Sequence, residues 1–348
     1  MKPLTSILSI AAIVLAGTIA SSHAQNATTD PVGFVTTTVR ASSNGIAYSA
    51  TPISPVLLAA SSVNGTTTGA TTSIGDTTIT IASAGWTSNQ LSSSDVNVLF
   101  KSGNLTGLIV PVTANTADTL TLATEGLNLS SIGGAVGDSI QLIQGDTLAS
   151  MFGDATNGVF GGNATQFSAS QTDKVTTTDS SGTVRVYYYN TQFSQWRRSG
   201  SSTDQGAVRI SPTAGAFYSR ISTSNMTTTT TGNVPIAQVK YIVPTSGSRY
   251  FARYFPTDGN INDFGFQSLP GWRSTNQSGV TIATADKIVT TDSGGTIRTY
   301  YYDGTVWKRT GSSSAQNSVA VSVGGSVQTT RFGSGNAEIA TVSLPYSL

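Results

Sequence analysis

The chain contains no cysteine and a single histidine, His23. The lack of thiols excludes disulfides, thiolate metal ligands and cysteine nucleophiles. Because His23 lies in a segment that we expect to be removed, the remaining chain has no Ser-His-Asp or Cys-His system and no histidine base. We therefore expect no catalytic site, no metal site and no cofactor.

Charged side chains are also scarce, at 10% of the residues, and the only two glutamates are Glu125 and Glu338. Two carboxylates facing each other in a cleft would permit a glycoside hydrolase or lyase, but no local spacing selects such a pair. No glycine-rich loop has the pattern that cradles phosphates. A net charge of +1 and expected export argue against nucleic-acid binding. We predict a protein that is not an enzyme.

The first 24 residues have the pattern of a secretion signal. Lys2 provides the positive start, residues 7–20 are apolar, and Ser22-His23-Ala24 is a small-x-small cleavage site, which puts the mature start at Gln25. The alternative is a membrane anchor, but this apolar run is short for a span, and no later run approaches about 20 apolar residues. We expect a secreted protein, extracellular or at the cell surface, with the periplasm as a further possibility.

The few charges are unevenly distributed. Residues 25–170 carry two basic and eight acidic side chains, a net charge of −6, whereas residues 171–348 carry fifteen and nine, a net charge of +6. Opposite fields on the two halves favour head-to-tail contact between copies. The alternative is that the two halves neutralise each other within one chain.

Thr, Val and Gly dominate, as is typical of strands joined by tight turns. Period-two alternation predicts strands over residues 31–39, 77–82, 96–100, 107–114, 119–123, 139–143 and 338–344. Pro111 predicts that its strand lies at an edge or contains a bulge. Residues 147–153 are predicted to form a short helix. The polar run 61–75 is interpreted as a flexible joint or a turn cluster, and Thr227–Thr231 as a joint.

These patterns predict an all-β fold of several small antiparallel sandwich or barrel modules, with a duplicated C-terminal unit and at most two short helices. The expected domains are a signal peptide (1–24), an N-terminal strand and loop (25–60), a small β-barrel or sandwich (61–145), and two β repeat units (146–232 and 233–348).

The duplication is visible directly in the sequence. Residues 172–200 (TDKVTTTDSSGTVRVYYYNTQFSQWRRSG) align with residues 285–311 (ADKIVTTDSGGTIRTYYYDGTVWKRTG) with one two-residue gap. Alternation predicts that Tyr187 and Tyr189 share one strand face, and that Asp303-Gly304 forms a tight turn before Trp307. Trp196 is expected to share a face with Arg198, and Trp307 with Arg309.

Two interpretations of these aromatic residues remain open. In one, exposed Tyr and Trp rings with neighbouring Arg form a platform that stacks on sugars; in the other, the rings stabilise the hairpins from inside. The candidate ligand-binding residues for the first interpretation are Tyr187, Tyr189, Trp196, Tyr300, Tyr302 and Trp307.

One further motif resembles the start of a calcium loop. Asp258, Asn260 and Asn262 have the spacing, but Asp263 stands where that loop requires Gly and Leu269 where it requires an acid. A polar turn is the expectation.

Several motifs together resemble one known family. They are DPVGFVTTTV, GWTSNQL, PVTANTADTLTLATEGLNL, GDSIQLI and the two YYY…W[RK]R units. The chain resembles an uncharacterised, secreted, highly paralogous family of Verrucomicrobia and their relatives. The resemblance implies location and a β-rich build, and no activity or site. PVTANTADTLTL is also similar to small β modules of bacterial surface and phage structural proteins.

From these observations we expect a non-enzymatic structural protein of the cell surface or extracellular matrix. Its partner would be itself or another surface protein, with PVGFVTTTV as the strand that pairs with a neighbour. The alternative is a carbohydrate-binding or adhesion protein that recognises polysaccharide through the repeated Tyr-Trp faces.

Overall fold

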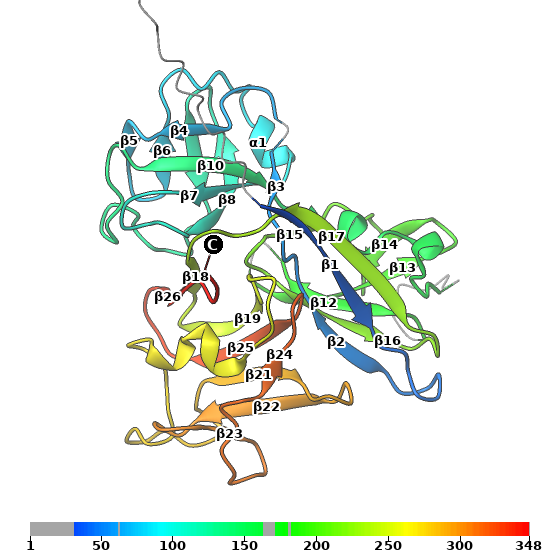
Figure 1. Ribbon diagram of the computed structural model, residues 1–348. Coiled ribbons are helices and arrows are strands. Elements are labelled where there is room, and N and C mark those ends of the chain that lie inside the picture. Colours follow the sequence, from blue (N-terminus) through cyan, green and yellow to red (C-terminus); the bar gives the residue numbers. More distant parts are fainter. Residues whose placement is uncertain (1–30, 62, 163–170, 180–181, 348) are drawn as a thin grey trace, which may run out of the picture. The chain divides into compact units, whose positions relative to one another are not determined.

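The computed structural model describes residues 31–61, 63–162, 171–179 and 182–347 (Figure 1). Strands make up 41% of the chain and helices 6%, which confirms the all-β prediction. Every strand-to-strand ladder is antiparallel, and the α-helices are α1 (Gln90–Ser93) and α2 (Leu148–Phe152). The expected signal peptide lies outside the described residues. None of the helices in the described part is long and apolar enough to cross a membrane.

One sheet forms a small barrel, which we call the inserted barrel. Its strands are β3 (Ala59–Ala60), β4 (Thr68–Ala70), β5 (Ser73–Ile74), β6 (Thr78–Thr80), β7 (Val96–Phe100), β8 (Ile109–Asn115), β9 (Thr119–Leu122) and β10 (Ser139–Gln144). The order is β3-β10-β7-β8-β9-β6-β5, and β4 also pairs with β10. Since only Thr71-Thr72 separates β4 from β5, the sheet curls back on itself. Alternate apolar side chains, including Trp86 and Phe100, fill the interior.

The strands predicted in this region are confirmed. Pro111 does not lie at an edge, because β8 sits between β7 and β9, but the register of β8 shifts between Val112 and Ala114, directly after it. The joint expected over residues 61–75 is wrong, since β4 and β5 lie there. Their Thr and Ser side chains suit short strands as well as turns, so composition alone did not distinguish the two.

Two five-stranded sheets share one topology. The first contains β2 (Ser49–Ile53), β12 (Lys174–Thr178), β13 (Val184–Asn190), β14 (Gln195–Arg198) and β16 (Ala216–Arg220); the second contains β19 (Ser246–Ala252), β21 (Lys287–Thr291), β22 (Ile297–Tyr302), β23 (Trp307–Arg309) and β25 (Ser326–Phe332). Their orders are β14-β13-β12-β16-β2 and β23-β22-β21-β25-β19. Each aligned sequence repeat therefore forms three consecutive strands at one edge of a larger sheet, β12 to β14 or β21 to β23.

Two-stranded ribbons extend the duplication. They are β1 (Val32–Val39) with β17 (Met226–Asn233), β18 (Val239–Val243) with β26 (Glu338–Val342), β11 (Asp146–Thr147) with β15 (Arg209–Ile210), and β20 (Gly259–Asn260) with β24 (Ala320–Val321). The first and third belong to one copy, the second and fourth to the other. After β11, α2 and the 3₁₀ helix η1 (Ala155–Asn157) follow, and after β20 the 3₁₀ helices η2 (Ile261–Phe264) and η3 (Phe266–Ser268). We call the copies the first and second repeat units.

The first repeat unit thus begins at β1 and not at residue 146, because β1 and β2 pair with β17 and β16. The barrel is inserted between β2 and β11. The joint expected over Thr227–Thr231 is also wrong, because these residues lie in β17 opposite β1. Pairing between segments so distant in sequence leaves no local signal.

A buried ion pair occurs at the same place in both repeat units. Asp173 accepts from Arg220 at 2.6 Å and from the backbone of Ile221. Asp286 accepts from Arg331 at 2.9 Å and from the backbone of the residue after it. All four charged side chains are almost fully buried. Each pair joins the start of β12 or β21 to the end of β16 or β25.

The segment that resembles a calcium loop is a helix cap. The Asn260 side chain accepts from the backbone of Asn262, and Asp263 accepts from the backbone of Asn260. Asp258 instead accepts from the backbone of Val323. Thr147 caps α2 in the first repeat unit in the same way.

Candidate binding surface and cavity

The hairpins place the predicted aromatic residues in the expected register. Tyr187 lies opposite Arg198 and Tyr189 opposite Trp196, so these side chains share one face of the sheet. In the second repeat unit Tyr300 lies opposite Arg309 and Tyr302 opposite Trp307.

That face, however, is turned into the protein. Tyr187, Tyr189, Trp196, Tyr300 and Trp307 are buried, and Tyr302 is half-buried. The Tyr189 and Trp196 rings meet edge to face at 5.8 Å, and Phe152 of α2 packs against Trp196. In the second unit Trp272 packs against Trp307 at 5.7 Å.

Of the two interpretations that the sequence left open, the platform of exposed rings is therefore wrong, and these rings form part of the core. Alternation reveals that the rings share a face, but it does not reveal whether another element covers that face. Here α2 and the segment that contains Trp272 cover it.

The ribbon of β1 and β17 has an exposed face. Val32 and Phe34 are 75% and 74% exposed, the highest values among aromatic and large aliphatic side chains of any described strand. Five exposed threonines, including Thr36 and Thr229, share this face, and the hydroxyls of Thr36 and Thr229 lie 3.1 Å apart. Neither strand contains a charged residue, and β17 is the only described strand that pairs with β1.

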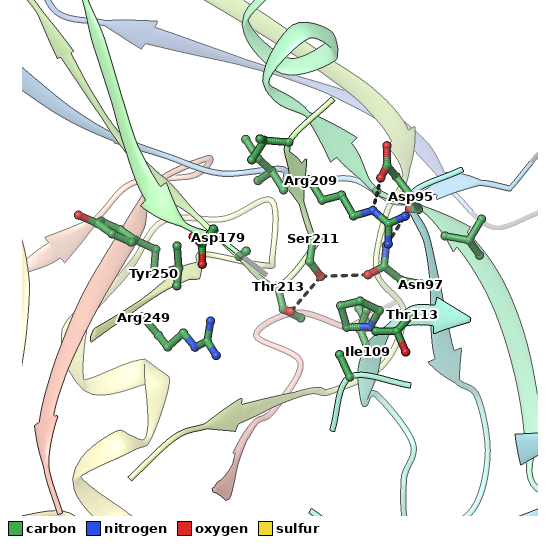
Figure 2. A pocket seen from close by; sticks show the side chains of 18 of the residues that line it. Asp95, Asn97, Ile109, Thr113, Asp179, Arg209, Ser211, Thr213, Arg249 and Tyr250 are labelled. Carbon is green, nitrogen blue, oxygen red and sulfur yellow. Dashed lines mark hydrogen bonds and ion pairs between the residues drawn. The ribbon is translucent and has the colours of Figure 1, made fainter. Parts of the chain in front are cut away.

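A cavity of about 690 Å³ lies where the inserted barrel and the two repeat units meet (Figure 2). Its size is within the range of about 300–1,000 Å³ typical of small-molecule sites. Asp95, Asn97 and Thr113 come from the barrel, Arg209 and Ser211 from the first repeat unit; Arg249 and Tyr250 line it from the second.

Ion pairs across this cavity join the barrel to the repeat units. Arg209 pairs with Asp95, and Arg249 pairs with Glu125 at 2.6 Å. Burial raises the pKa of the Asp95 carboxyl, although Arg209 acts in the opposite direction. Two acidic side chains of residues 25–170 thus pair with two arginines of residues 171–348 within one molecule.

Neutral polar groups continue along the same wall. The Ser211 hydroxyl donates to the Asn97 amide oxygen at 3.2 Å and lies 3.4 Å from the Thr213 hydroxyl (Figure 2). Tyr187 also lines the cavity and is only 1% exposed, yet its hydroxyl forms no hydrogen bond with any residue in the described part of the chain. It is the one predicted site residue that lines the cavity.

Most of the cavity could not be found from the sequence. Arg198 was noted only because it shares a face with Trp196, and Arg209, Arg249 and Tyr250 carried no signal. These residues are recognised only by their proximity in the structure, where three modules that are distant in sequence line one cavity.

Within the described residues, no group of three or more acidic or histidine side chains could hold a metal ion. Comparisons with protein-family models, with curated proteins and with solved structures find no match to this chain.

Proposed function

We propose that this chain is a secreted, non-enzymatic structural protein of the cell surface or extracellular matrix, and that it associates with copies of itself through the ribbon of β1 and β17. The observation that carries the proposal is the free edge of β1 beside an exposed apolar face. A free strand edge presents unpaired backbone donors and acceptors to a second strand.

The partner that fits best is a second β1. Two such edges related by a twofold axis would pair antiparallel and form one four-stranded sheet. Val32 and Phe34 of both chains would then lie on one continuous face. The ribbon lacks the Lys and Pro residues that commonly protect edge strands.

Charge complementarity is a weaker basis for assembly than the sequence indicated. Arg209–Asp95 and Arg249–Glu125 already use part of the opposite charge inside one molecule. Edge pairing relies on backbone hydrogen bonds and apolar contact, so we expect association to persist when salt is added.

The test is sedimentation velocity on the chain from Gln25 to Leu348 over a wide range of protein and salt concentrations. We expect a concentration-dependent dimer that resists salt. Phe34→Lys places a charge on the exposed face of β1 and should weaken association about tenfold or more, because it removes apolar burial.

Val136→Lys is the matched control, since Val136 is 68% exposed on the inserted barrel, away from the ribbon. It should leave association unchanged. A wild-type chain that stays monomeric at high concentration and low salt would overturn the proposal, as would equal losses in both variants. Association that salt abolishes would point instead to contact between the charged halves.

A further inference from the structure

The cavity contains polar groups that the fold itself does not use. The Tyr187 hydroxyl has no hydrogen-bond partner among the described residues, although the side chain is buried. Burial is the main cause that raises the pKa of this hydroxyl, so it stays protonated and can donate. Its oxygen is not among the fully buried polar atoms without a partner, and the residue lines the cavity, so this donor is available to a molecule bound there.

Among the charged residues that line the cavity, one arginine has no carboxylate partner. Each lining carboxylate has an arginine partner: Asp95 has Arg209, Glu125 has Arg249, and Asp179 has Arg185. Arg198 also lines the cavity, and no described carboxylate lies within ion-pair distance of it. It stands directly opposite Tyr187 in the hairpin, so the free cation and the free hydroxyl are neighbours.

The rest of the wall is mixed. Asn97, Ser211 and Thr213 offer amide and hydroxyl groups that both donate and accept. Ile109, Pro111, Val208, Ile242 and Phe251 provide apolar surface. A ligand matched to this wall presents a carboxylate to Arg198, together with several hydroxyls and an apolar face.

We propose that the cavity binds a small acidic saccharide, with its carboxylate on the Arg198 guanidinium and a ring hydroxyl on Tyr187. The other hydroxyls of the saccharide bind Asn97, Ser211 and Thr213, and the C–H face of a sugar ring packs on the apolar wall. The carboxylate supplies the charge that Arg198 lacks, in the planar geometry to which a guanidinium binds well. This site is independent of the β1 edge.

Isothermal titration calorimetry tests the proposal on the chain from Gln25 to Leu348, with digalacturonate and its methyl ester as probes. The two probes have the same hydroxyls and differ in charge. We expect digalacturonate to bind about tenfold or more tightly than the ester, because a charged hydrogen bond to Arg198 is lost in the ester. Arg198→Gln should weaken digalacturonate binding to the level of the ester and leave ester binding unchanged.

The duplication supplies the matched control. Arg309 holds the position of Arg198 in the second repeat unit, opposite Tyr300, and is not among the residues that line this cavity. Arg309→Gln should therefore bind digalacturonate like the wild-type chain. Absence of saturable binding for both probes, equal binding of acid and ester, or equal losses in the two arginine variants would each overturn the proposal.

Discussion

The two repeat units have the same strand order and the same buried Asp–Arg pair, but their ribbons differ. In the second unit one face of β18 and β26 is packed into the core through Val239, Tyr241, Val243 and Ala340. On the other face, Ile242 of β18 packs against the core of the inserted barrel. In the first unit β1 and β17 are longer, rich in threonine, and exposed on one face. The two units therefore share the five-stranded sheet and the buried ion pair, and they differ in how far the ribbon is covered by the rest of the protein.

The largest expected effect tests the shared part of this comparison. Arg331→Met removes the partner of a fully buried Asp286, and Arg220→Met does the same to Asp173. Each should lower the free energy of unfolding by about 3–5 kcal/mol, because an unpaired charge is left in the interior. Urea denaturation followed by circular dichroism measures the loss.

The matched control is Arg298→Met, which breaks the half-exposed pair with Asp292 and should cost under about 1 kcal/mol. If Arg331→Met and Arg220→Met lower the free energy of unfolding no more than this control does, the buried ion pairs do not stabilise the two units.

An intermediate effect tests the difference between the ribbons. Val239→Thr buries a hydroxyl within the second ribbon and should cost about 1–3 kcal/mol. Val32→Thr changes a residue that is mostly exposed, so it should alter stability by less than about 0.5 kcal/mol. The same denaturation measurement compares them, and a similar cost for both would mean that the first ribbon is covered in solution.

The smallest expected effect concerns the turns of the two hairpins. Asp303 in the second unit stands where the first has Asn190. Burial acts to raise the pKa of Asp303, but the Lys308 ammonium and the backbone amides of Val306 and Thr305 outweigh it and lower the pKa well below its usual range. A lowered pKa gives stability above the unfolded value of about 3.9, and that stability is lost as the pH falls.

We therefore expect Asp303→Asn to reduce the dependence of stability on pH between about pH 5 and pH 2. Asn190 does not titrate, so Asn190→Ala should leave that dependence as it is. NMR titration of the Asp303 carboxyl provides a direct check, and a pKa at or above the usual value would contradict the expectation.

Local patterns predicted much of the fold. Alternating apolar residues fixed β7 to the residue and β1, β9 and β10 to within one, and residues 147–153 contain α2. What alternation could not provide was the pairing of β2 with β16, since the two strands are separated by a whole inserted barrel. The same limit hid the true extent of the first repeat unit.

The candidate site was predicted less well than the fold. The register of Tyr187 and Arg198 follows from the hairpin, but the burial of the rings depends on α2, which packs against them from elsewhere in the chain. The cavity depends on three modules meeting, and no single stretch of sequence carries that information. That Arg198 has no described carboxylate within ion-pair distance could be seen only in the three-dimensional structure.

The place of the inserted barrel also has a consequence for the order of folding. β1 and β2 are synthesised first, but their partners β17 and β16 follow the barrel in the sequence. The first repeat unit therefore cannot complete its strand pairing until the barrel has been synthesised. The barrel does not need to wait, and its own first and last strands pair, with Ala60 opposite Ile143. Once folded, it brings β2 and β11 close together and shortens the loop that the first unit has to close. We expect the barrel to fold first and thereby to bring the two separated parts of the first repeat unit close enough to pair.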